Sequence, residues 1–65
     1  MARPRIYKIV SRADGTFTLN QEANGGWYHD TKYPSEEAAR AAVEARNTAN
    51  FPAIIDQDYV PAMFR

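Results

Sequence analysis

The residue best suited to proton transfer in this chain is its single histidine, His29, which stands directly before Asp30. An imidazole supported by a carboxylate is a common general base. This pair, however, is expected on a short strand, where successive side chains point to opposite faces of the sheet. Ser11 and Ser35 are explained as a strand residue and a helix cap, and the sequence contains no cysteine. We therefore expect a protein that is not an enzyme.

Metal and phosphate sites have no recognisable set of donors either. Asp56 and Asp58 lie two residues apart, but one histidine and scattered acids do not give the ligand spacing of a zinc or calcium site. The stretch from Asn24 to Gly26 lacks the lysine and the following helix of a phosphate-binding loop. We expect no cofactor, no metal and no small-molecule substrate.

A cluster of basic residues near the start is the first candidate binding feature. Its members are Arg3, Arg5, Lys8 and Arg12, and no acid stands among them. On the exposed face of a sheet they could enter the major groove of DNA, which accommodates a β-ribbon. The simpler explanation is that such charges keep an edge strand soluble. Eight basic and eight acidic residues cancel over the chain, so duplex DNA binding is the alternative function here.

The second candidate binding feature is the C-terminal segment, residues 50–65, which is rich in large apolar side chains. Pro52 and Pro61 interrupt any long regular element there. One interpretation is that the segment folds back across the open face of the sheet, around Ile6 and Val10. The other is that it contacts a protein partner or a second copy, because exposed apolar patches usually mark interaction sites. The expected contact residues are Tyr59, Val60, Met63 and Phe64.

The scaffold for these features begins with a predicted hairpin. Residues 5–12 are rich in β-branched and aromatic types, which favours a strand. A three-residue loop follows, with Gly15 in the left-handed position of a bulge. In the next strand, placing Ser11 opposite Phe17 also pairs Ile9 with Leu19 and puts these apolar residues on one face.

A second turn around Asn24-Gly25 leads into a short third strand, from residue 26 to about residue 31. A three-residue loop would turn Trp27 toward the core, and a two-residue loop would turn Tyr28 there. We favour Trp27, because it has the larger apolar surface.

A helix is predicted from Glu36 to about Asn47. Ser35 is a natural N-cap, and the acids that follow it lie at the positive end of the helix dipole. The side chains expected to face the sheet are Ala38, Ala42, Ala45 and Ala49, flanked by Ala39 and Val43. The resulting fold class is α+β, a three-stranded antiparallel β-meander with one α-helix packed on one face (β-β-β-α) and an irregular C-terminal segment. The whole chain is expected to form one small domain, with residues 5–49 as its core.

Chain length favours association with something else. A domain of 65 residues buries only about 60% of its unfolded surface and is marginal alone, and no disulfide can support it. Oligomerisation or a partner is the remaining stabiliser. No apolar run approaches the roughly 20 residues needed to span a bilayer, and the first residues lack the apolar core of a signal peptide. We expect a cytoplasmic protein without membrane contact.

Residues 5–49 resemble two groups of small β-β-β-α domains. Residues 33–41, Tyr-Pro-Ser-Glu-Glu-Ala-Ala-Arg-Ala, resemble the arm-DNA-binding domains of phage tyrosine recombinases, in which an aromatic strand end leads into a capped helix of the form Ser/Thr-x-Glu-Ala-x-x-Ala. The Tyr7-Lys8-Ile9 strand and the Asp14-Gly15 turn resemble short uncharacterised bacterial domains of the same element order. Both resemblances imply the fold. The first would imply DNA binding, but this sheet lacks the dense basic decoration of that family.

The expectation for function is therefore a non-catalytic protein-binding module. A homodimer is one form of it. An inhibitor of host machinery is another, since small chains of this kind are common among phage proteins with that role.

Overall fold

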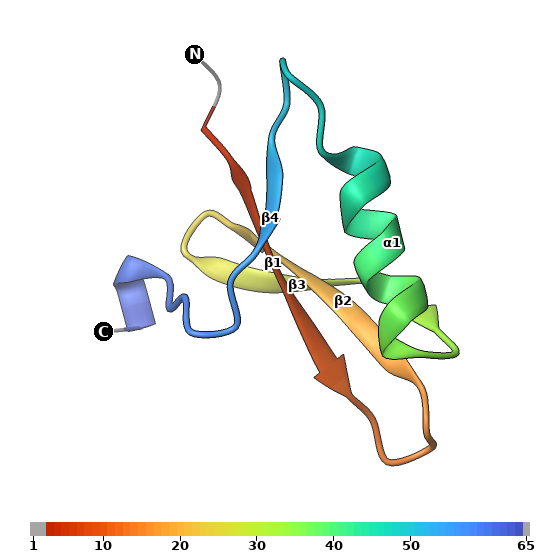
Figure 1. Cartoon of the computed structure of the whole chain (residues 1–65). Helices are drawn as coiled ribbons and strands as arrows, with labels where there is room; N and C mark the ends of the chain where they lie inside the picture. Colours follow the sequence, from red (N-terminus) through yellow and green to blue (C-terminus); the bar gives the residue numbers. More distant parts are fainter. Residues whose placement is uncertain (1–2, 65) are drawn as a thin grey trace.

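The computed structural model describes residues 3–64, without the side chains of Asp30 and Phe64. The elements in chain order are β1 (Arg5–Ser11), β2 (Phe17–Ala23), β3 (Gly26–Tyr33), α1 (Glu36–Arg46), β4 (Ala53–Ile55) and the short 3-10 helix η1 (Ala62–Phe64). The strands form one sheet of order β3-β2-β1-β4. α1 lies on one side of it and the C-terminal segment on the other (Figure 1). The predicted α+β class, a β-meander with one helix packed against it, is confirmed.

The first hairpin has the predicted register. Ser11 lies opposite Phe17 and Ile9 opposite Leu19, and Gly15 has a φ of 86°. The Arg12 N–H donates to the Thr16 carbonyl at 2.8 Å, and the Gly15 N–H donates to the Arg12 carbonyl at 3.1 Å. These bonds close a loop of three residues, in which only glycine adopts the left-handed conformation without cost.

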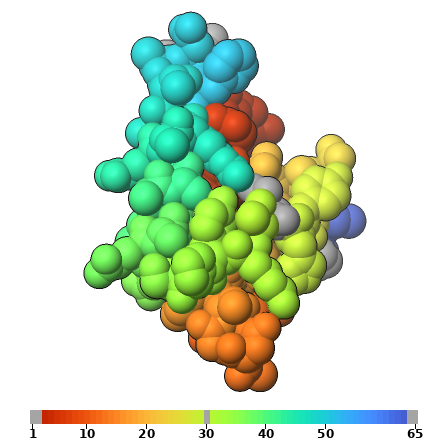
Figure 2. Space-filling view, turned by 90° about the vertical axis from the view of Figure 1, so that its right-hand side faces the viewer, coloured from red at the N-terminus to blue at the C-terminus, as the bar shows by residue number. Residues whose placement is uncertain are grey.

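The second turn contains two residues, and the expectation that Trp27 faces the core is wrong. Asn24 and Gly25 have φ values of 53° and 81°, as a type I′ turn requires. Trp27 is therefore opposite Glu22, and Tyr28 is opposite Gln21 on the helix side of the sheet. Tyr28 is nevertheless 57% exposed, because α1 does not cover the β2–β3 turn, drawn in yellow in Figure 2.

The helix begins as predicted and presents a different face. The Ser35 hydroxyl accepts the N–H of Ala38 at 3.1 Å, which makes Ser35 the N-cap. Ala39 and Val43 are buried, whereas Ala45 is exposed. The predicted alanine row is thus rotated away from the sheet, since Val43 is the one large apolar side chain of the helix and takes the centre. The predicted row also included Ala49, which lies beyond the helix end and is exposed.

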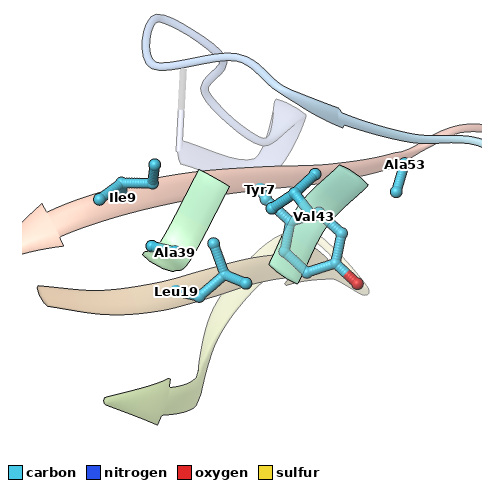
Figure 3. Close-up of a cluster of buried hydrophobic side chains, with 6 residues drawn as sticks. All are labelled: Tyr7, Ile9, Leu19, Ala39, Val43 and Ala53. Atoms are coloured by element: carbon cyan, nitrogen blue, oxygen red, sulfur yellow. The ribbon is translucent and has the colours of Figure 1, made fainter. Parts of the chain in front are cut away.

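The core lies between α1 and the sheet (Figure 3). Its buried members are Tyr7, Ile9, Leu19, Ala39, Val43 and Ala53, with Phe17, Tyr33, Ala42 and Ile55 packed around them. Ala39 on the helix, fully buried, lets the two layers approach closely, so Tyr7 and Leu19 supply most of the volume.

A fourth strand forms in the segment that was expected to be irregular. β4 runs parallel to β1, with Ile6 opposite Ile54 and Tyr7 opposite Ile55. Parallel neighbours need a crossover connection, and α1 provides it between the two edges of the sheet. The start of β4 is held by the side-chain oxygen of Asn47, the C-cap residue of the helix, which accepts the Ala53 N–H at 3.0 Å.

Leu19→Ala tests the core. Because Leu19 is 0% exposed, the substitution should lower the free energy of unfolding by about 2–5 kcal/mol. Urea denaturation followed by circular dichroism measures this change. Phe51→Ala is the control, since Phe51 is 63% exposed, and it should change stability by about 0.5 kcal/mol or less. A loss below about 1 kcal/mol for Leu19→Ala would contradict the core assignment.

The pH dependence of the first turn is a second test. The hydroxyl and the backbone N–H of Thr16, with Lys32, lower the pKa of Asp14 from 3.8 to about 2. The folded pKa lies below the unfolded value, so ionised Asp14 stabilises the turn above about pH 4. That contribution is lost as the pH falls through the folded value.

The carboxyl carbon-13 shift of Asp14, followed against pH, measures the midpoint. Thr16→Val removes the hydroxyl that donates to Asp14 and should therefore raise the pKa of Asp14. A midpoint near 4 in the unsubstituted chain would show that the turn does not hold the carboxylate.

Candidate partner interface

The sheet face opposite α1 carries three of the side chains discussed in the sequence analysis: Lys8, Arg12 and Trp27. Alternation along β1 places Lys8 and Arg12 there with Ile6 and Val10, as predicted. β3 adds Trp27, since it lies opposite Glu22, the neighbour in register of Ile6. On this face the C-terminal segment and Lys8 both contact the Trp27 ring.

The C-terminal segment folds back across this face, which is the first of the two interpretations that the sequence left open. The Tyr59 ring meets the Trp27 ring edge to face, with centroids 5.9 Å apart and an angle of 88° between the planes, a favoured aromatic geometry. The Lys8 ammonium lies 4.8 Å from the centroid of the same Trp27 ring. Pro61 is fully buried. Trp27, absent from the core, thus anchors the segment from the other side of the sheet.

Gln57 fastens the same segment to the edge of β1. Its Oε1 accepts the Ile9 N–H at 2.8 Å, and its Nε2 donates to the Ile9 carbonyl at 3.1 Å. One residue earlier, the Asp56 N–H donates to the Tyr7 carbonyl at 3.0 Å. The side-chain amide therefore continues the hydrogen bonding of β4 beyond its last residue. No sequence signal pointed to Gln57, because its partner lies 48 residues away.

The outer side of the segment is apolar and open. Val60 is 37% exposed and Met63 is 66% exposed, and we call these two residues the C-terminal patch. Tyr59, also expected to contact a partner, is half-buried against Trp27. Phe64, the fourth expected contact, has a side chain that lies outside the described residues.

The four basic residues predicted as a DNA-contacting group are not brought together. Arg5 lies on the helix side, where its Nη2 donates to the Arg46 carbonyl at 2.7 Å and to the Phe51 carbonyl at 3.1 Å. Lys8 rests on Trp27. Arg3 is exposed ahead of β1.

Arg12 forms a small polar cluster with Thr18 and His29. Its Nε donates to the Thr18 hydroxyl at 2.9 Å, and its Nη2 lies 2.9 Å from Nδ1 of His29. The arginine is a permanent donor, so this contact requires Nδ1 of His29 to be the acceptor. The cluster ties β1 and β2 to β3 on the surface.

Within residues 3–64 no group of three or more His, Cys, Asp or Glu side chains is placed to hold a metal ion. The same part of the chain encloses no pocket. None of its helices has the length and apolar character needed to cross a bilayer.

Gln57→Ala tests the fastening of the segment. Amide hydrogen exchange at Ile9 should become about 2- to 10-fold faster, as expected for a lost hydrogen bond worth about 0.5–1.5 kcal/mol. Exchange at Val10, which pairs with Thr18 on β2, is the internal reference. Asp58→Ala is the matched control, because the Asp58 contact to Asp56 uses only its backbone N–H. Unchanged exchange at Ile9 in Gln57→Ala would contradict this role.

No protein-family model, no curated protein and no solved structure matches this chain.

Proposed function

We propose that this chain is a non-catalytic protein-binding module whose C-terminal patch contacts a different protein. The observation that supports this is the contrast between the two sides of residues 56–63. Gln57, Tyr59 and Pro61 anchor the segment to the sheet, while Val60 and Met63 remain exposed, Met63 with one side of its chain against Gly25. Val60 and Met63 stand three residues apart in one short segment, and exposed apolar side chains that form a continuous patch usually mark interaction sites.

Anchoring matters for affinity as well as for position. A segment that is already held in one conformation loses less conformational entropy on binding than a free tail would. The apolar patch is thus presented on a fixed support, which lowers the conformational part of the entropy lost when a partner buries it.

We propose that the protein is located in the cytoplasm. Its specific role would be that of a phage-type domain that inhibits a host protein. The absence of cysteine agrees with a reducing compartment. The background for the inhibitory role is that small chains of this kind are common among phage proteins that bind and inhibit host machinery.

Duplex DNA binding through the sheet receives less support from the geometry. It needs several basic residues on one accessible face, and Arg5 is engaged on the opposite side by backbone carbonyls. The C-terminal segment also crosses the face that carries Lys8, and it brings the acids Asp56 and Asp58 with it. Binding of this kind would weaken with salt by a log–log slope of about −0.9 per phosphate neutralised, which a gel-shift titration would detect.

The double variant Val60→Asp/Met63→Asp tests the proposal. The immobilised chain should retain a partner protein from a host lysate, and the double variant should lose it. Phe51→Asp is the control: Phe51 is about as exposed as Met63, 63% against 66%, but it lies in the α1–β4 loop, which is far from the C-terminal end of the chain (Figure 1).

The retained protein is then purified and its affinity is measured by calorimetry. The double variant should weaken binding at least about tenfold, the usual effect of removing a central apolar contact. Circular dichroism checks that both variants are folded. Equal affinity of the double variant and the unsubstituted chain would reject the C-terminal patch as the interface.

A further inference from the structure

The two edges of the sheet differ in how their outward backbone groups are paired. At one edge, β4 covers the start of β1, and Gln57 satisfies the backbone of Ile9 beyond it. At the other edge, within residues 3–64, no strand lies beyond β3. An edge strand with open backbone groups is a template for pairing with another strand.

The backbone groups that face outward along the first part of β3 follow from the turn. Ala23 pairs with Gly26 across the two-residue turn, and such a pair exchanges hydrogen bonds. Alternation then directs the backbone of Gly26 and Tyr28 toward β2, and that of Trp27 and His29 away from the sheet. Farther along, a shift in register between Thr18 and Asn20 disturbs the regular geometry. The regular part of this edge is therefore Gly26–His29.

This part of the edge lacks the features that usually prevent strand pairing. Proteins protect their edges with charged side chains, proline or bulges. In β3 the charged residues Asp30 and Lys32 and the register shift come after residue 29, and residues 26–29 contain no Lys, Arg, Asp, Glu or Pro. They contain three aromatic rings instead. Tyr28 in particular is more than half exposed on a part of the sheet that α1 leaves uncovered (Figure 2).

We propose that β3 pairs with β3 of a second copy of this chain, antiparallel, about a two-fold axis at Tyr28. The axis sets Tyr28 against Tyr28 of the second copy, and Trp27 against His29 on both sides of it. The outward backbone groups of Trp27 and His29 then meet each other as a hydrogen-bonded pair. Aromatic rings thus oppose one another over residues 27–29, so this part of the edge is complementary to itself.

The second copy is favoured over a strand from another protein because of this self-complementarity. An isologous contact needs the same surface to match itself, and the residue on the axis, Tyr28, is uncharged. The cations that rest on Trp27 and His29, those of Lys8 and Arg12, lie on the opposite face of the sheet from Tyr28. The pairing would join two sheets into one of eight strands with both helices on the same face. It would also bury additional surface in a chain of 65 residues, a length at which a lone domain is only marginally stable.

The test is sedimentation equilibrium of the full chain over a range of concentrations. We expect a monomer–dimer equilibrium. Tyr28→Glu places two carboxylates opposite each other on the axis and should raise the dimer dissociation constant at least about tenfold, since like charges brought together in an interface are strongly unfavourable. Tyr28→Gln is the neutral control and should retain the dimer better than Tyr28→Glu.

A second pair of variants examines the backbone itself. His29→Pro removes an N–H that faces outward, and His29→Ala keeps that N–H while losing the same contact to Arg12. Loss of the dimer in His29→Pro with its retention in His29→Ala would support edge pairing. Circular dichroism checks folding, and if His29→Pro does not fold, the Tyr28 pair decides.

Two results would overturn the proposal. One is a chain that stays monomeric at every concentration. The other is a dimer that Tyr28→Glu leaves unchanged. The Val60→Asp/Met63→Asp variant separates this surface from the C-terminal patch, because it should dimerise like the unsubstituted chain even when it no longer binds a partner protein.

Discussion

The positive φ angles of Asn24 and Gly25 are the constraint on which both faces of this sheet depend. They make the β2–β3 connection two residues long, and that length decides which side of the sheet Trp27 occupies. With Trp27 on the face away from α1, its ring becomes the support for Lys8 and Tyr59. Gly25 is needed for a second reason as well: a Cβ there would lie 2.5 Å from Sδ of Met63, so the turn also makes room for the end of the C-terminal segment.

Two arginines, Arg5 and Arg46, stabilise the C-terminal end of α1. The last carbonyls of a helix have no partner within it, and here Arg5 reaches across from β1 to satisfy the Arg46 carbonyl. Arg46 in turn places its guanidinium 5.5 Å from the centroid of the Tyr7 ring. Both arginines thus join β1 to the end of α1. The positive charge that the sequence concentrates near its start therefore serves the interior of the fold as well as its surface.

Local signals in the sequence were sufficient for the first hairpin and for the helix start. Gly15 adopts a left-handed conformation in its turn, and Ser35 accepts a backbone N–H three residues away. Both roles are local, so they can be predicted without knowledge of the rest of the fold. Side-chain size predicts the wrong face for Trp27, because the two-residue turn at Asn24-Gly25 decides which face it occupies. β4 and Gln57 were missed because their hydrogen-bond partners on β1 are nearly the whole chain away, and three residues are too few to show a strand pattern.

The hydrogen bonds between Gln57 and Ile9 have a consequence for folding during synthesis. β1 is synthesised first and can pair with β2 at once, but its other edge must wait for Ala53–Ile55 and then for Gln57, 48 residues later than Ile9. Contacts between residues so distant in sequence form late in folding. During synthesis, therefore, the nascent sheet has two open edges, and the edge of β1 closes only when the C-terminal segment emerges. Until that moment the edge of β1 presents unpaired backbone groups with which a strand of another chain could pair.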